Sequence, residues 1–240
     1  TELAVEINQI DLQQLSRFAA IPDMQGRVNV ALRYVPSDVS YLIAADANID
    51  NLIFRGQPVG ELLLNGVYLP LDNNRHRFDA HFYHNESELA TVSAFYRQPQ
   101  QKQAQGAIDG TMQFDRIPLS ELNPFFGGAV DMQGVLRGRL TLESRDRGPI
   151  WNGYLQLDST SMYVRAVGTR FRFDDQEVDI KDSKLRLTKY GIYTTGGNPF
   201  VISGTVDFSK PMKETADLRL AAQDMLLIDA PDGAPGAMLY

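Results

Sequence analysis

The three histidines of the chain are the first residues whose type and spacing suggest chemistry, because His76, His81 and His84 lie close together in the sequence. Imidazole groups are common ligands of transition metals. In an extended strand, however, successive side chains point to opposite faces, so His81 would point away from His76 and His84. Three imidazoles therefore cannot converge on one ion without a β-bulge, and we predict no metal site.

A second group of candidate residues is acidic. Asp174, Asp175, Glu177, Asp179 and Asp182 lie close together, but they lack the spacing and the central glycine of an EF-hand calcium loop. We interpret these carboxylates as a solvated turn and the solvated face of a strand.

Residues that could support catalysis are scattered. Paired carboxylates such as Asp115 and Glu121 have no convergent partners that would make them a general acid and base. No nucleophile elbow, phosphate-binding loop or dinucleotide fingerprint follows a predicted strand. The absence of cysteine removes thiolate nucleophiles, cysteine-ligated zinc and iron–sulfur clusters. We therefore predict a protein that is not an enzyme and that uses no cofactor.

Length and charge set further limits on function. The chain has 240 residues, with 23 Lys and Arg against 30 Asp and Glu, so its formal net charge is −7. This balance argues against electrostatic binding of nucleic acid or of an anionic membrane surface. No apolar run reaches the roughly 18 residues of a spanning helix, and Thr1-Glu2-Leu3 does not begin a signal peptide. We expect a segment of a longer protein, or a chain whose targeting segment has been removed.

Apolar and polar residues alternate along most of the chain, which is the period of a half-buried β-strand. Trp151, Leu155 and Leu157 would lie on one face of such a strand, and Asn152 would lie on the opposite face. The same alternation occurs in several further runs: Val28/Val30/Leu32/Tyr34, Phe78/Ala80/Phe82, Phe171/Phe173, Val178/Ile180, Leu185/Leu187, Phe200/Ile202/Val206/Phe208 and Leu218/Leu220. Turn residues separate these runs at short intervals. The pattern predicts an all-β chain of many short antiparallel strands.

Two stretches, 10–18 and 117–126, break this alternation. Their apolar residues recur three positions apart, as in one or two short helical turns. Each stretch is followed by the word Asp-Met-Gln-Gly, at 23–26 and at 131–134. We interpret this recurrence as an internal repeat.

The repeat predicts a division of the chain into two parts. The apolar triplet of the first helical stretch matches that of the second at one constant separation of 107 positions. We predict a first strand meander over 1–105 and a second over 106–240, or alternatively one continuous β-groove.

The apolar face of such a sheet must be covered by something. A second sheet would give a sandwich, closure would give a barrel, and a half-pipe would leave a dry concave face for an apolar ligand. Periodicity alone leaves these three alternatives open.

The second part of the chain carries a resemblance to a known family. The segments 110–125, 133–142 and 149–157 follow one another in an order and spacing that resemble the C-terminal region of the TamB family, within the AsmA-like group. The later segments 178–187, 202–206 and 217–229 look like subsequent elements of that region. The first hundred residues fit only as an earlier repeat.

The resemblance implies both a fold and a role. It implies an elongated, U-shaped antiparallel β-sheet with an apolar concave groove. It also implies a periplasmic protein, anchored in the inner membrane by an N-terminal segment, that bridges inner and outer membranes. Such a protein would shield phospholipid acyl chains during transport and would support outer-membrane protein assembly with a β-barrel partner of the TamA type.

We predict that the groove is lined by residues of shared parity in the second part of the chain. The predicted acyl-chain contacts are Trp151, Leu155, Leu157, Phe171, Phe173, Ile180, Leu185, Leu187, Ile202, Val206, Phe208, Leu218 and Leu220. An alternative hypothesis is a scaffold or chaperone that offers an open sheet edge to client β-barrel strands and binds no lipid.

Overall fold

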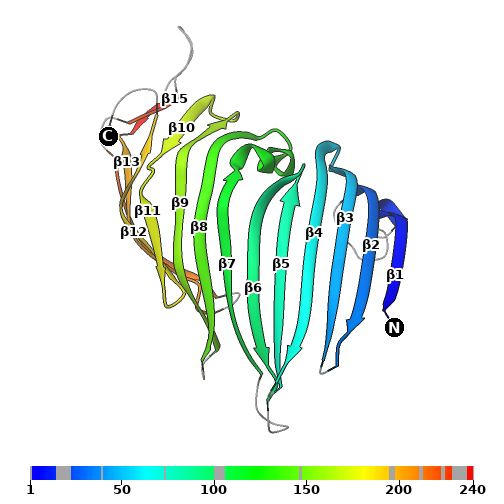
Figure 1. The fold of residues 1–240 in the computed structure, drawn as a ribbon. Coiled ribbons are helices and arrows are strands. Elements are labelled where there is room, and N and C mark those ends of the chain that lie inside the picture. Colours follow the sequence, from blue (N-terminus) through cyan, green and yellow to red (C-terminus); the bar gives the residue numbers. More distant parts are fainter. Residues whose placement is uncertain are drawn as a thin grey trace. The chain divides into compact units, whose positions relative to one another are not determined.

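A computed structural model shows an antiparallel β-protein and confirms the all-β prediction (Figure 1). The structure describes residues 2–14, 23–38, 40–72, 74–99, 106–145, 148–194, 198–210, 213–222, 225–228 and 237–239. No helix in these ranges is both long enough and apolar enough to cross a membrane.

Fourteen strands form one sheet, in which nearly all neighbours are consecutive in the chain. The first seven are β1 (Leu3–Asp11), β2 (Met24–Pro36), β3 (Tyr41–Phe54), β4 (Gln57–Leu71), β5 (Arg75–His84), β6 (Ser87–Arg97) and β7 (Ala107–Pro118). The next seven are β8 (Val130–Arg145), β9 (Gly148–Val164), β10 (Thr169–Phe173), β11 (Glu177–Lys181), β12 (Lys184–Tyr193), β13 (Phe200–Asp207) and β14 (Thr215–Ala221). Strands β15 (Met225–Ile228) and β16 (Ala237–Leu239) form a separate two-stranded sheet.

The chain divides into two compact units. Unit 1 comprises residues 1–115 and 141–149, and unit 2 comprises residues 116–140 and 150–240. In unit 1, each strand from β1 to β6 pairs antiparallel with the next, and Figure 1 shows β2 to β6 side by side.

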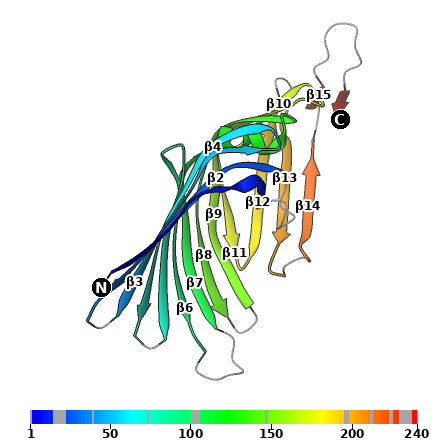
Figure 2. The same ribbon diagram turned by 90° about the vertical axis from the view of Figure 1, so that its right-hand side faces the viewer.

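Unit 2 contains a departure from simple consecutive pairing. The long strand β9 pairs with β11 around Leu155 and with β10 around Met162. Strand β12 in turn pairs with both of these short strands and with β13. Strand β14 then pairs with β13, and Figure 2 shows β12, β13 and β14 side by side.

Helical turns occur at both places where the sequence predicts them. Residues Leu12–Gln14 are helical, whereas 15–18 lie outside the described residues. The 3₁₀-helix η1 covers Leu119–Phe126 and ends at Gly127, which adopts a left-handed conformation with φ +57°. Leu12 and Leu119, at matching positions of the two stretches, are both buried.

The Asp-Met-Gln-Gly words begin similar local structures in the two units. Gly26 in β2 has φ +147° and Gly134 in β8 has φ +104°, conformations that favour glycine. A Cβ atom on Gly26 would lie nearest to the carbonyl oxygen of Asp50, at 3.0 Å, and one on Gly134 would lie nearest to Cα and Oγ1 of Thr160, at 2.6 Å. Asn51 and Ser159, which are adjacent to these two residues, have φ near +50°. Each glycine therefore permits close approach of the following strand next to an irregular residue.

The buried core of unit 1 lies at the end of the sheet next to the first helical turn. Leu12, Leu52 and Val59 are its buried members. Met24, Val28, Ile49, Phe54 and Leu62 pack against them. In unit 2, the buried Tyr190 donates a hydrogen bond through its hydroxyl to the carbonyl oxygen of Asp174, at 2.8 Å.

Candidate functional site

The strand register of unit 1 places apolar residues from seven strands on one face of the sheet. Residues that are directly opposite in antiparallel strands point to the same face. One row across the sheet, for example, contains Val5, Leu32, Ala45, Gly66, Ala80, Val92 and Met112. A second row contains Leu3, Tyr34, Ile43, Tyr68, Phe78, Ala94 and Gly110. We call this surface the apolar face of unit 1.

Many large side chains on this face are exposed. They are Leu3, Val5, Ile7, Leu32, Tyr34, Phe78, Phe82 and Ile108, which are between 36% and 62% exposed. On the opposite face of unit 1, the only described large apolar residues with at least 36% exposure are Val35 and Val67. Contiguous exposed apolar surface on a soluble fold marks a site of interaction.

The opposite face carries a polar network. The carboxylate of Asp50 accepts hydrogen bonds from the amides of Asn29, at 2.9 Å, and Asn48, at 2.7 Å. The carboxylate of Asp46 accepts one from Asn65, at 2.7 Å, and lies 3.6 Å from Arg33. Hydrogen-bonded polar side chains of β2, β3 and β4 therefore distinguish this part of the opposite face from the apolar face.

The centre of the apolar face contains small side chains. Ala45, Gly66 and Ala80 are cross-strand neighbours on β3, β4 and β5. The adjoining rows place larger side chains on both sides of them, among them Phe78 and Phe82. The centre of the apolar face thus contains a row of small residues flanked by larger apolar side chains.

One end of the apolar face is aromatic. Tyr41 lies 5.4 Å from Tyr34 and 6.0 Å from Tyr68, measured between ring centroids. Tyr68 contacts His76, which in turn lies 5.9 Å from Tyr96. The resulting row, the aromatic end, crosses five strands from β2 to β6.

Hydrogen bonds join several of these rings. The hydroxyl of Tyr68 lies 2.8 Å from Nδ1 of His76. A hydrogen bond with the side chain of Tyr41 is the main cause that raises the pKa of Tyr68. Nε2 of His76 is buried and has no hydrogen-bond partner in the described part of the chain.

The register of unit 2 brings most of the predicted acyl-chain contacts to one face. Leu155 is opposite Val178, and Ile180 is opposite Leu185, which is opposite Val206. In the same way, Leu187 shares its face with Leu218, Ile202 with Leu220, and Phe173 with Ile192. Phe171 is opposite Met162. Trp151 and Leu157 are half-buried residues of β9, and the half-buried Phe208 follows the end of β13.

The predicted residues of unit 2 differ in accessibility. Ile180 is 6% exposed, so it packs inside the protein and offers little surface to a ligand. Leu218 and Leu220 are 40% and 58% exposed. The remaining predicted residues are half-buried. Leu218 and Leu220 on β14 are therefore the most available contacts in this unit.

The sequence analysis missed the whole apolar face of unit 1 as a candidate site. The alternation of apolar residues in Val28–Tyr34 and Phe78–Phe82 can be recognised in the sequence, but the strand register that aligns these runs into common rows cannot. The resemblance to TamB proteins lies in the second part of the chain, so no residue before Trp151 was predicted to contact acyl chains.

The three histidines are divided between the two faces of unit 1, which confirms the predicted parity. His76 and His84 lie on the apolar face and His81 on the polar face. Nδ1 of His81 lies 2.6 Å from Oε1 of Glu88. His84 contacts the carbonyl oxygen of Val59 through Nε2, at 2.5 Å.

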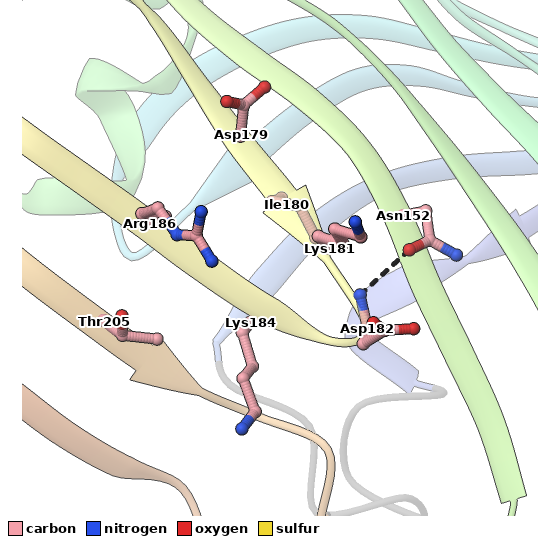
Figure 3. Close-up of a pocket in the computed structure, with 8 residues that line it drawn as sticks. All are labelled: Asn152, Asp179, Ile180, Lys181, Asp182, Lys184, Arg186 and Thr205. Atoms are coloured by element: carbon pink, nitrogen blue, oxygen red, sulfur yellow. Dashed lines mark hydrogen bonds between the residues drawn. The ribbon is translucent and has the colours of Figure 1, made fainter.

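A polar cavity of about 980 Å³ lies at the β11–β12 hairpin of unit 2 (Figure 3). Its charged lining residues include Asp179, Lys181 and Arg186. Asp182 donates its backbone N–H to the side-chain oxygen of Asn152, at 2.9 Å. The mixed charges and the lack of histidine or cysteine among the described lining residues give this cavity no evident catalytic constellation.

Comparisons of the chain with protein-family models, with curated proteins and with solved structures find no match.

Proposed function

We propose that this chain is a non-catalytic lipid-binding segment whose apolar sheet faces shield phospholipid acyl chains from water. The observation that carries the proposal is the apolar face of unit 1, where eight large apolar side chains remain exposed. Among the described residues the opposite face has two large apolar side chains of comparable exposure, Val35 and Val67, so most of the exposed apolar surface lies on one side of the sheet.

The energetics suit a ligand that is long and apolar. Burial of each methylene group contributes about 0.8 kcal/mol. On a sheet face this gain would come from many weak contacts spread over several strands. An acyl chain would be held without one strong anchoring contact and could exchange along the surface.

The cellular role is a proposal that rests on the resemblance to TamB proteins. It is a periplasmic segment of a cell-envelope protein that bridges the two membranes and is anchored in the inner membrane. In that role the apolar faces support phospholipid transport and outer-membrane protein assembly together with a TamA-like barrel.

Leu32 and Val35 provide a matched test of lipid binding. Both lie on β2, both are 40% exposed, and they point to opposite faces of the sheet. The chain is purified from cells, its lipid is extracted, and phospholipid per protein is measured by mass spectrometry. Leu32→Asp should lose most of the bound lipid, whereas Val35→Asp should retain it. Equal lipid contents in both variants, or no lipid in the unaltered protein, would contradict the proposal.

A second candidate function is strand addition to a client β-barrel protein. The observation that favours it is the exposure of two strands that end the sheet order, β1 and β14. An end strand has backbone N–H and C=O groups with no partner in the sheet, and these can pair with an added strand. Proline at an outward-bonding position of β1 should then block client assembly while lipid content stays unchanged. Normal client assembly with this variant would count against the second function.

A further inference from the structure

The polar cavity at the β11–β12 hairpin lies on one face of the sheet of unit 2 (Figure 3). The register places Asp179 opposite Arg186, and Arg186 opposite Thr205. Lys181 and Lys184 are likewise directly opposite each other. Residues directly opposite in antiparallel strands share a face, and so do residues two positions apart in one strand. The side chains of these five residues therefore share the face opposite to that of the predicted acyl-chain contacts of β11 and β12.

One pair of residues in this cavity brings like charges together. Lys181 ends β11 and Lys184 begins β12, so only Asp182 and Ser183 separate them in the chain. Like charges directly opposite each other in a sheet are destabilising. The ammonium group of Lys184 lies 3.3 Å from the carboxylate of Asp207, whereas Lys181 forms no ion pair with a described residue. The positive charge of Lys181 is therefore available to a ligand.

A second pair has opposite charges but forms no ion pair. Asp179 and Arg186 are directly opposite each other, yet neither is ion-paired with a described residue. Figure 3 shows the two side chains extending in different directions, with Arg186 reaching from β12 towards β11. A guanidinium group binds phosphate through two parallel hydrogen bonds, and a carboxylate accepts hydrogen bonds from hydroxyl groups. Both side chains thus provide ligand-binding groups on the same face.

The rest of the lining is also polar. Asn152 and Thr205 contribute an amide and a hydroxyl group, and no aromatic side chain lines the cavity among the described residues. Most pockets for small ligands are largely apolar, so this one favours a highly polar ligand. Its volume, about 980 Å³, is at the upper end of the range for such pockets. The carboxylates of Asp179 and Asp182 disfavour a polyanion, because they would repel it.

We propose that this cavity binds a phosphorylated sugar. Lys181 and Arg186 are diagonal neighbours across β11 and β12, so their long side chains can contact one phosphate group. The hydroxyl groups of the sugar donate hydrogen bonds to Asp179 and exchange them with Asn152 and Thr205. A ligand with one anionic group and several hydroxyl groups complements both the cations and the acceptors of the lining. The inference goes beyond the proposed function, since the site lies on the other face of the sheet from the predicted acyl-chain contacts.

Titrations followed by NMR spectroscopy test the site. The chain, labelled with nitrogen-15, is titrated separately with glucose 6-phosphate, glucose and inorganic phosphate. Glucose 6-phosphate should shift the backbone amide signals of residues 179–186 and should bind at least about tenfold more tightly than either of the other two ligands. Equal affinity for inorganic phosphate would contradict the sugar contacts. Unchanged signals in 179–186 would overturn the site.

A charge variant tests the contact with phosphate. Arg186→Gln should weaken the binding of glucose 6-phosphate about tenfold, because a charge-assisted contact is lost. The control is Arg219→Gln, since Arg219 is an exposed residue of β14 that lies on the same face but not in the lining of the cavity. This control removes the same charge and should change the affinity less than about twofold. Equal weakening in both variants would indicate a general charge effect and would contradict the site.

Asp179→Asn tests the contact with the sugar. The carboxylate of Asp179 accepts hydroxyl groups but repels phosphate, so its removal should favour inorganic phosphate over the sugar phosphate. The ratio of the affinity for glucose 6-phosphate to that for inorganic phosphate should fall at least about threefold. An unchanged ratio would contradict this contact.

Two sources present this chemistry, a free sugar phosphate and the head group of a glycolipid. Vesicles of phosphatidylcholine, with or without monophosphoryl lipid A, distinguish the two sources in a flotation assay. Stronger binding to the vesicles with lipid A that is lost in Arg186→Gln would assign the site to a glycolipid head group. Equal binding to both kinds of vesicle, together with binding of glucose 6-phosphate, would assign it to a free sugar phosphate.

Discussion

Trp151 and Ser183 bind each other through two hydrogen bonds. The backbone N–H of Trp151 donates to Oγ of Ser183, at 3.0 Å, and the backbone N–H of Ser183 donates to the carbonyl oxygen of Trp151, at 2.8 Å. The carbonyl oxygen of Ser183 also accepts the backbone N–H of Phe208. Ser183 is fully buried, so this turn residue connects β9 to the end of β13.

Ser183→Ala should lower the free energy of unfolding by about 1–3 kcal/mol, because the N–H of Trp151 loses its acceptor inside the protein. Thr188→Ala is the control, since Thr188 is an exposed residue of the neighbouring strand β12. Urea unfolding monitored by Trp151 fluorescence measures both variants. A loss as small as that of Thr188→Ala would show that Oγ of Ser183 contributes nothing.

Gly153→Ala should be more destabilising than Gly168→Ala. Both glycines have positive φ, +140° and +64°. A Cβ on Gly153 would clash with the carbonyl oxygen of Arg139, whereas a Cβ on Gly168 would meet no atom within 4 Å. We expect a loss of about 1 kcal/mol at Gly168, from backbone conformation alone, and several kcal/mol at Gly153.

Thermal unfolding followed by circular dichroism measures both glycine variants. Equal shifts in melting temperature would mean that the backbone contact between β8 and β9 can relax without loss.

The stability of unit 2 should fall in alkaline solution through Tyr190. Burial, followed by the charges of Asp174 and Asp175, raises the pKa of Tyr190 to about 12. An unfolded tyrosine ionises near pH 10. The raised pKa therefore contributes stability that is fully present below pH 10 and is lost as the pH rises towards 12.

Tyr190→Phe should remove this part of the pH dependence. At neutral pH it should lower the free energy of unfolding by about 1 kcal/mol, because the hydrogen bond to Asp174 is lost. Urea titrations at pH 8 and pH 11 measure the difference. If the unaltered protein and the variant lose equal stability between these pH values, the tyrosine does not ionise as described.

Ile180 and Leu220 should separate stability from lipid binding. Ile180→Ala removes a buried side chain and should lower the free energy of unfolding by about 2–5 kcal/mol. Leu220→Ala changes a residue that is 58% exposed, so it should affect stability by less than about 1 kcal/mol.

Crosslinking to lipid should distinguish the two faces of β14. A photoreactive residue at position 220 should crosslink to acyl chains, whereas one at the neighbouring Arg219, on the opposite face, should not. Crosslinking of equal strength at both positions would remove the distinction between the faces of β14.

The faces of individual strands could be predicted from the sequence because the period of two is present in the residue order itself. β-Bulges were not predictable in this way. Lys189 has φ +51°, and the pairing of β12 with β13 shifts between Leu187 and Tyr190. Strict alternation from Leu187 would place Lys189 on the apolar face, yet the shift places Tyr190 there.

The register between neighbouring strands could not be predicted from the sequence alone either. The apolar face of unit 1 depends on register, which aligns Leu32 of β2 with Ala45 of β3 and then with Gly66 of β4. Each run shows which of its residues share a face, but not which residue of the next run lies opposite. The row of small residues and the aromatic end can be identified only when these registers are combined.

The consecutive strand order has a consequence for how such a chain can change in length. Strands β1 to β7 pair in the order in which they are synthesised, and each turn connects immediate neighbours. Duplication or deletion of one hairpin would therefore preserve every other connection and keep the parity of the remaining strands. The reach of the lipid-binding surface can thus evolve by whole hairpins, without redesign of an interior.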